Sequence, residues 1–412
     1  MDGLRNFQVP KYLRRIISSY LRDREIIYET AQGIRLRRVT AGAVQGSVLG
    51  PDLWNIMYDQ VLGLPMPEDT FTVGYADDLV LVITARDVKT AEEKLNLAMH
   101  GVNYWMEDHG LQLAAAKTEI VLFTRKHIET IIPICIGEDR ILAKENLKYL
   151  GVLLDTKLTF MAQILKITEK AARLTNALSR LMRNTRGPKT GKRRLLMSVT
   201  HSILLYGAEV WADCIRKVTY ASKLTSVQRQ GALRISCAYR TVSLEAALVI
   251  AGVIPIDLLA LERQCIYLNK EREGIDRAKA SARQISLNKW QDRWTDYSES
   301  RWTKRLIGEI SPWITRGHGD INYFLPQFLS GHGLFCSYLF RIKKMNSAES
   351  IHILPYSSYI TFYITNVYIN KNCSKSLNTK LLFLANDNKN NRLKIDYGKL
   401  KIFLILKKIS SK

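Results

Sequence analysis

Apolar and polar positions near the start of the chain change between a helical and a strand-like period. Residues 11–29 place apolar side chains at helical spacing, which predicts an amphipathic helix with a basic face, and residues 34–41 predict a strand. A helix is predicted from residue 53 to residue 64, just after Pro51, and another over residues 88–109. The N-terminal part therefore mixes helices with short strands.

An acidic dipeptide, Asp77-Asp78, separates two apolar runs of strand length, residues 71–76 and 79–83. Because both runs are rich in β-branched residues, they predict two paired strands with the acids at the turn. Adjacent carboxylates repel one another near an apolar core, and a divalent cation removes that repulsion. The alternative for the dipeptide alone is an ordinary β-turn, in which Asp is common.

Further along the chain the pattern becomes helical. Strands are predicted at residues 120–123 and 147–155, the second broken at Gly151, so the first 155 residues are α/β or α+β. Residues 160–285 read as nearly all helix, and residues 286–345 as a small helical unit. Four tryptophans in that unit favour core packing over base stacking: Trp290, Trp294, Trp302 and Trp313.

From about residue 346 the composition shifts to Asn, Lys, Ile, Tyr and Ser without a clear period. Residues 346–412 are therefore predicted to be a low-complexity basic tail that is poorly ordered.

The charge balance indicates which class of partner the protein binds. Lys and Arg total 61 against 38 for Asp and Glu, a formal net charge of +23, which favours nucleic acid first and an anionic membrane surface second. One cluster of cations favours contacts with nucleic-acid phosphates, a solvated helix face being the alternative. Its members are Arg180, Arg183, Arg186, Lys189, Lys192, Arg193 and Arg194.

The spacing of the cysteines and the lengths of the apolar runs indicate where in the cell the protein is expected. The six cysteines are widely spaced and form no C-x-x-C pair, which favours reduced thiols in an intracellular protein. Zinc binding by His318, His332 and Cys336 is the less favoured alternative. We find no signal peptide and no apolar run of the roughly 20 residues that a bilayer span needs, so no membrane partner is expected; nucleus and cytoplasm both stay open.

An ordered series of motifs is more specific than any one of them. It comprises the Gly-rich loop 42–51, Tyr75-Ala76-Asp77-Asp78, Gly110-Leu111, Lys117-Thr118-Glu119 and Leu147-Lys148-Tyr149-Leu150-Gly151. This series resembles the palm of reverse transcriptases, specifically those of insect-type non-LTR retrotransposons. Residues 205–211, 239–243 and 327–333 are similar to the thumb and C-terminal region of that family, so the resemblance covers roughly residues 1–345.

The resemblance implies an α+β fold, a right-hand polymerase palm with partial fingers, followed by a helical thumb and a small helical C-terminal region. The implied domains are a remnant fingers/palm helix (1–38), the palm (39–158), the thumb (159–285), the C-terminal region (286–345) and the tail (346–412).

The implied activity is RNA-directed DNA polymerisation, in which two Mg²⁺ (or Mn²⁺) ions assist transfer from a dNTP to the 3′-hydroxyl of a DNA primer on an RNA template. Asp77 and Asp78 match the catalytic metal-binding pair. The residues that match nucleotide and template contacts are Gln45, Gly46, Tyr75, Ala76 and Lys117, and those of the primer-holding hairpin are Tyr149, Leu150 and Gly151.

The sequence departs from the family pattern in four respects. No third carboxylate on a strand is found before the first helix, Val44 stands where proline is usual, no zinc knuckle follows residues 330–333, and no endonuclease precedes the palm. We therefore expect an N-terminally truncated enzyme with little or no polymerase activity. The alternatives are a catalytically inactive nucleic-acid-binding remnant of a retrotransposon, and a fragment without a role that folds poorly because part of its sheet is uncovered.

Overall fold

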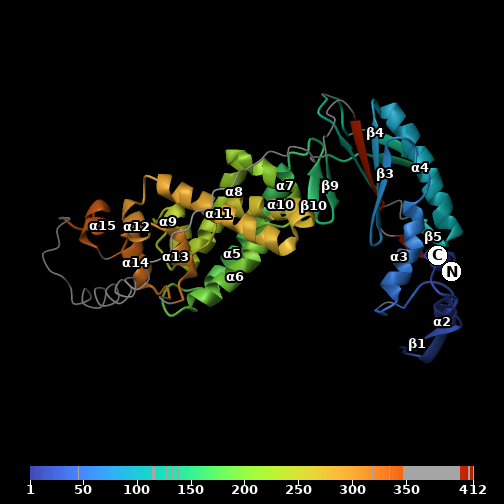
Figure 1. Cartoon of the computed structure of the whole chain (residues 1–412), viewed down its shortest axis with the longest axis horizontal. Helices are drawn as coiled ribbons and strands as arrows, with labels where there is room; N and C mark the ends of the chain where they lie inside the picture. The colour runs from blue at the N-terminus through green and yellow to red at the C-terminus, as the bar shows by residue number, and fades with distance from the viewer. Residues whose placement is uncertain are drawn as a thin grey trace. The chain divides into compact units, whose positions relative to one another are not determined.

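A computed structural model describes most of the chain. The described residues are 1–44, 46–113, 117–126, 128–131, 133–136, 139–317, 320–333, 335–346, 400–406 and 409–411. They fall into two compact units, unit 1 (residues 1–159 with 391–412) and unit 2 (residues 160–390), which Figure 1 shows with their elements labelled. The fold is mixed α+β, with small sheets in unit 1 and helices in unit 2. The finer division into five domains stays a prediction.

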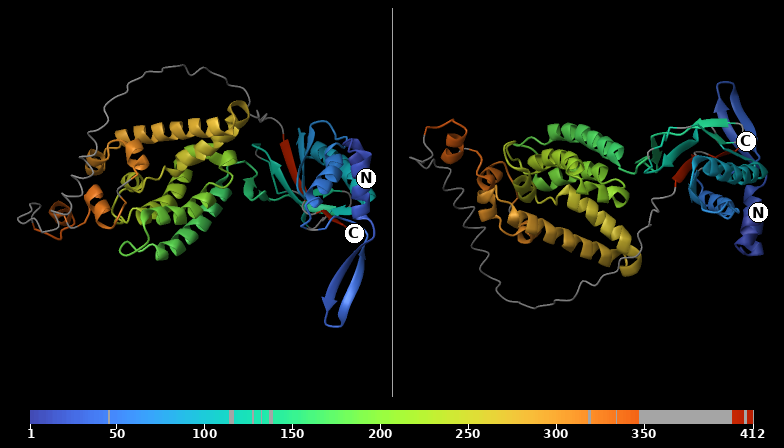
Figure 2. Two further views of the ribbon diagram at one scale, coloured as in Figure 1. Left: turned by 60° about the horizontal axis from the view of Figure 1, so that its bottom comes forward. Right: turned by 90° about the horizontal axis from the view of Figure 1, so that it is seen from above.

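Unit 1 begins with helices α1 (Asp2–Asn6) and α2 (Lys11–Leu21) and the hairpin β1 (Arg24–Thr30) and β2 (Gly33–Val39), a two-stranded ribbon visible in Figure 2. The predicted strand is confirmed, but the predicted helix over 11–29 was wrong in its second half. Asp23 takes a positive φ of 50°, which ends the helical course, and Arg38 bonds its carboxylate at 2.7 Å. The β-prone residues that follow then pair with β2, for example Ile27 with Leu36.

The main sheet has four strands in the order β3-β4-β11-β6, all neighbours antiparallel. The strands are β3 (Thr70–Tyr75), β4 (Asp78–Ala85), β6 (Glu119–Phe123) and β11 (Leu400–Leu406). Helices α3 (Gly50–Leu62) and α4 (Val88–Asp108) supply the core of one face, where Leu79, Leu81 and Ile83 are buried. Val80 lies in a separate core, as the alternation of a strand requires. The predicted hairpin, both helices and the strand at residues 120–123 are confirmed.

Three more strand pairs complete unit 1. They are β5 (Leu111–Leu113) with β12 (Ile409–Ser411), β7 (Pro133–Ile136) with β8 (Asp139–Leu142), and β9 (Asn146–Tyr149) with β10 (Val152–Asp155). The predicted broken strand at residues 147–155 is this last hairpin, whose turn residues Leu150 and Gly151 have positive φ of 44° and 88°. Strands β11 and β12 lie within the predicted tail, of which residues 347–399 lie outside the described residues.

Unit 2 confirms the helical prediction. Its elements are α5 (Met161–Leu181), α6 (Thr190–Leu204), α7 (Ala208–Trp211), a 3-10 helix (Ala212–Arg216), α8 (Val218–Ile235), α9 (Leu244–Ala251), α10 (Ile256–Glu273), α11 (Ile275–Asp296), α12 (Arg301–Leu306), α13 (Ile310–Thr315), α14 (Phe324–Ser330) and α15 (Cys336–Arg341). No described helix alone is long and apolar enough to cross a membrane, although α6 with residues 208–216, and α9 with α10, meet the criterion as bent pairs.

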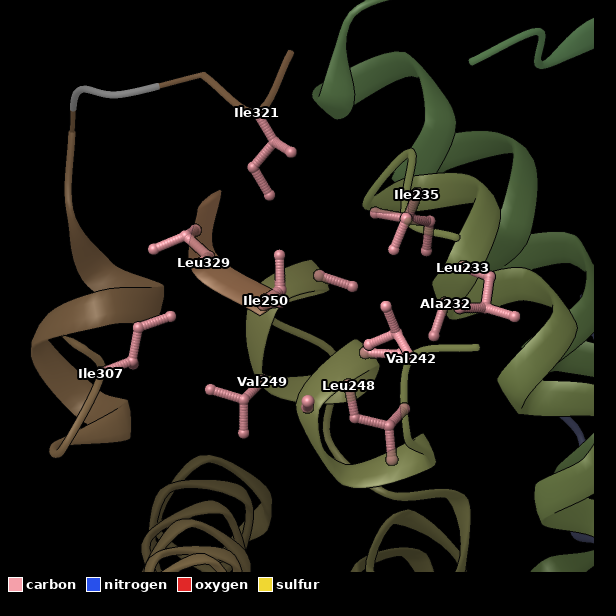
Figure 3. Close-up of a cluster of buried hydrophobic side chains, with 14 of the residues drawn as sticks. Ala232, Leu233, Ile235, Val242, Leu248, Val249, Ile250, Ile307, Ile321 and Leu329 are labelled. Atoms are coloured by element: carbon pink, nitrogen blue, oxygen red, sulfur yellow. The ribbon is translucent and has the colours of Figure 1, made fainter. Parts of the chain in front are cut away.

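The core of unit 2 surrounds α9, a short helix on which residues 246–251 are all buried. Figure 3 shows side chains from α8, α9 and the later helices in this cluster. Trp290 and Trp294 are fully buried in it, which confirms core packing for these two tryptophans. The buried amide of Gln228 donates to the Ile254 carbonyl and accepts from the Ile256 amide, each at 2.8 Å, and so satisfies the backbone before α10.

Candidate active site

The acidic pair lies at a two-residue turn between β3 and β4. Tyr75 pairs with Asp78, so Ala76 and Asp77 form the loop. Ala76 has a positive φ of 54°, the backbone state that a two-residue hairpin with this twist requires. The indole of Trp54, on α3, donates to the Ala76 carbonyl at 3.0 Å. The turn is thereby tied to a helix, with Asp77 exposed and Asp78 half-buried.

Two tyrosines lie close enough to the acidic pair for its charges to shift their pKa values. Tyr58 stacks on Trp54 with ring centroids 5.4 Å apart and is buried between α3 and β3. Burial first, and then the charges of Asp78 and Asp77, raise the pKa of the Tyr58 hydroxyl well above its usual value. Burial and then Asp78 likewise raise the pKa of Tyr149. Two carboxylates and two neutral phenols therefore gather at the hairpin tip.

A glycine makes this arrangement possible. A Cβ at Gly74 would lie 2.8 Å from Cε1 of Tyr58, which is closer than side chains pack. Gly74 on β3 thus lets the ring of Tyr58 sit against the strand just before the acidic turn. The Tyr58 hydroxyl is buried and has no hydrogen-bond partner among the described residues, which marks a polar group available to a ligand or water.

The carboxylate pair suits a hard divalent cation. Mg²⁺ commonly takes only one or two protein carboxylates and completes its shell with water and substrate phosphates. Within the described part of the chain, no group of three His, Cys, Asp or Glu side chains is placed to hold a metal. Asp77 and Asp78 therefore fit the binding of one cation better than the enclosure of two.

The other residues expected at the site are placed as follows. Tyr75 is exposed beside Asp78, and Tyr149 approaches Asp78 from the hairpin β9–β10. Gly46 is exposed with a positive φ of 83°, and nothing lies within 4 Å of where its Cβ would be, so its backbone is open to close approach. Lys117 is exposed. Gln45 lies outside the described residues, and the roles of all these residues stay predictions.

Sequence reasoning missed Tyr58 and Trp54. Their signal is the i, i+4 spacing of two aromatic residues on the helix after the Gly-rich loop, which places both on one face. A second signal is Gly74 within the strand, because a glycine inside a strand often marks a place where another group approaches the backbone closely.

The basic segment of unit 2 does not present all seven cations. The side chain of Arg193 is 2% exposed and donates to the carbonyls of Pro188 (2.7 Å), Arg234 (2.9 Å), Met182 (3.2 Å) and Arg183. Arg194 donates twice to the Ala251 carbonyl, at 2.8 and 3.0 Å. The phosphate-contact prediction was therefore wrong for these two, because both hold backbone at helix ends.

The zinc alternative gains no support in the described residues. His332 accepts a hydrogen bond from Arg341 at 2.9 Å and packs edge-on against Tyr338. His318 lies outside the described residues, and no metal-binding group of three side chains is found in the part that is described.

Comparison with known proteins shows which family residues 1–154 resemble. A sequence model of the family "Reverse transcriptase (RNA-dependent DNA polymerase)" matches residues 1–154. Residues 1–154 are therefore similar to reverse transcriptases, and the relatives described next are proteins of mobile elements. No solved structure matches the chain.

Curated relatives extend the likeness into unit 2. The chain is 28% identical over 345 residues to the Retrovirus-related Pol polyprotein from type-1 retrotransposable element R1 of Bradysia coprophila, covering 74% of this chain and 34% of that protein. It is 25% identical over 331 residues to the protein of the same name from Nasonia vitripennis, covering 74% and 97%. The RNA-directed DNA polymerase from mobile element jockey of Drosophila melanogaster is 26% identical over 238 residues, covering 55% and 25%. The chain thus spans about a third or less of two of these three relatives.

Proposed function

We propose that unit 1 is the palm of an RNA-directed DNA polymerase and that unit 2 contains its helical thumb. The observation that carries the proposal is the acidic turn at Asp77-Asp78, tied to α3 through Trp54 and flanked by Tyr58 and Tyr149. The family match over residues 1–154 supports it. Its substrates are then an RNA template, a DNA primer and dNTPs.

Each residue of the site has a part in that reaction. Asp77 and Asp78 hold Mg²⁺ or Mn²⁺, which when bound supplies the charge that activates the primer 3′-hydroxyl and stabilises the leaving pyrophosphate. The hairpin carrying Tyr149, Leu150 and Gly151 positions the primer end. Tyr75 and Ala76 border the nucleotide, Gly46 and Gln45 lie against the template or nucleotide, and Lys117 meets the triphosphate charge.

We expect the polymerase activity of this chain to be low. Two adjacent carboxylates at one turn cannot easily surround two cations, and no third acid joins them in a metal-binding group within the described residues. A site that retains one cation but binds the second poorly keeps substrate affinity better than it keeps turnover.

The test is primer extension on an RNA template with dNTPs and Mg²⁺. We expect slow extension that falls at least about 100-fold in Asp77→Asn, since this removes a metal ligand. Glu107→Gln is the matched control, because Glu107 is an exposed acid on α4 and its loss should leave extension unchanged. Extension that survives both Asp77→Asn and Asp78→Asn would contradict the proposal, whereas fast extension by the unaltered chain would contradict the expected impairment.

A second candidate is a nucleic-acid-binding protein without catalysis. It is favoured by five cations around the start of α6 that remain exposed, namely Arg180, Arg183, Arg186, Lys189 and Lys192. Binding through phosphates would weaken with salt, with a slope reduced by about one for each contacting cation removed. We expect Arg183→Ala with Arg186→Ala to lower the slope, and Asp77→Asn to leave it unchanged. Extension activity above background by the unaltered chain would rule this candidate out.

A further inference from the structure

The central position of the main sheet is filled from the far end of the chain. Strand β11 (Leu400–Leu406) pairs along one edge with β4, from Leu400 with Ala85 to Leu406 with Leu79. Along its other edge it pairs with β6, from Lys401 with Phe123 to Ile405 with Glu119. Figure 1 shows this strand, in red, beside β4. Without it β4 and β6 have no neighbour on their facing edges within the described sheet.

The vacancy that β11 fills is deep rather than peripheral. Its partners Leu81 and Ile120, and likewise Ile83 and Leu122, have no exposed surface. An empty slot would leave the backbone groups of two strands without ladder partners between two apolar cores. Such a gap favours occupation by any extended apolar segment.

The order of elements explains why a gap exists at this place. Apart from the short strand β5, which belongs to another sheet, the hairpin β3–β4, helix α4 and strand β6 succeed one another as ββαβ, which is three strands of the split β-α-β arrangement. In that arrangement one further strand lies between the hairpin and the last strand. The only described strand in this position is β11, and it is antiparallel to both neighbours.

We infer that residues 400–406 act as a donor strand supplied by the same chain, which fills a strand-acceptor slot in unit 1 and closes it to strands of other molecules. A second anchor supports the assignment to this segment, since β12 (Ile409–Ser411), only three residues further along, pairs with β5 of the same unit. The sequence of β11, Leu-Lys-Ile-Phe-Leu-Ile-Leu, contains no acid. The strand therefore completes the sheet beside Asp78 without adding a carboxylate. This inference does not rest on the polymerase activity.

Disulfide trapping in the full chain tests the register. Thr84 lies directly opposite Lys401, a separation within reach of a disulfide in an antiparallel pair. We expect Thr84→Cys with Lys401→Cys to form an intramolecular disulfide, identified by peptide mapping, in at least 10-fold higher yield than Val73→Cys with Lys401→Cys. Val73 is the control because it lies on β3, which does not adjoin β11. Equal yields, or a 84–401 disulfide that joins two chains, would overturn the inference.

Hydrogen exchange on a proline variant supplies a second, independent measurement. Phe403→Pro removes a ladder donor from the middle of β11, and should speed amide exchange of residues 79–85 and 119–123 at least 10-fold. Asn390→Pro, ahead of the strand, is the matched control and should leave these rates unchanged. Exchange at residues 244–251 of α9 should be the same in all three proteins, which shows that unit 2 remains folded. Unchanged exchange in β4 and β6 of Phe403→Pro would refute the donor strand.

Discussion

The two units of this protein differ in where they place their charged side chains. Unit 2 brings cationic side chains inside, where Arg193 binds four backbone carbonyls and is almost inaccessible. Unit 1 leaves its distinctive charges at the surface, with Asp77 exposed at a turn. A buried charge that is hydrogen-bonded to backbone carbonyls helps to hold the fold, whereas a carboxylate at an exposed turn can be reached by a ligand. The comparison separates a side chain that holds the structure from one that stays accessible at the surface.

Apolar surface shows the same contrast. The helix α9 buries every side chain from Ala246 to Ala251, while the ribbon β1–β2 exposes Ile27 by 68% and Ile34 by 74%. Such an exposed, mixed apolar and basic ribbon stabilises unit 1 little.

Replacement of Arg193 is expected to have the largest effect on the difference between the two units. Arg193→Met removes the donors to four backbone carbonyls, so we expect the free energy of unfolding of unit 2 to fall by roughly 3–5 kcal/mol. Unit 1 should be unaffected. Hydrogen exchange followed separately in α6–α9 and in β3–β4 would measure both units in one sample.

The control for that experiment is Arg186→Ala, which removes an exposed cation from the same segment. A change within about 0.5 kcal/mol is expected. Equal destabilisation by Arg193→Met and Arg186→Ala would mean that the carbonyl contacts of Arg193 do not hold unit 2 together.

These two arginines also show where sequence reasoning stops. Nothing in the local sequence distinguishes Arg193 from Arg186, because burial is decided by helices that pack later in the chain. The helix predicted over residues 11–29 failed in its second half, because pairing with β2 overrides helical spacing there. The acidic hairpin, by contrast, was predictable because alternation, β-branched residues and turn are all local.

Long-range pairing accounts for the rest. Strand β11 lies in a segment without a clear period, and it pairs with β4 and β6, which come much earlier in the chain. The candidate site follows the same rule: Asp77 and Asp78 were predicted from the local pattern, whereas Tyr58 lies near them only through the packing of α3 on β3.

Gly74 in unit 1 and Gly231 in unit 2 allow the packing of the two units to be compared at single positions. A Cβ at Gly74 would meet the rigid ring of Tyr58 at 2.8 Å, whereas at Gly231 it would meet the flexible thioether of Met197 at 2.9 Å. We expect Gly74→Ala to destabilise unit 1 by about 1–3 kcal/mol and Gly231→Ala to cost unit 2 less, because methionine adapts and alanine favours helix.

Urea unfolding of each variant, with hydrogen exchange to assign the unit, measures the two costs. Gly74→Ala should also slow primer extension, because it displaces Tyr58 next to the acids. A larger cost at Gly231 than at Gly74 would contradict the view that Tyr58 is held rigidly against β3.

The smallest expected effect is a difference between the two units in how their stability depends on pH. Burial lowers the pKa of His201, on α6, from 6.5 to about 4 in the folded protein. The unfolded chain therefore takes up the proton first, so this part of the stability of unit 2 is complete above pH 6.5 and is lost as pH falls toward 4. Between pH 7 and pH 5.5 we expect a loss of about 1 kcal/mol, which His201→Gln should abolish. His100→Gln, an exposed histidine of unit 1, is the control. If the pH dependence of unit 2 persisted in His201→Gln, another buried group would have to carry it.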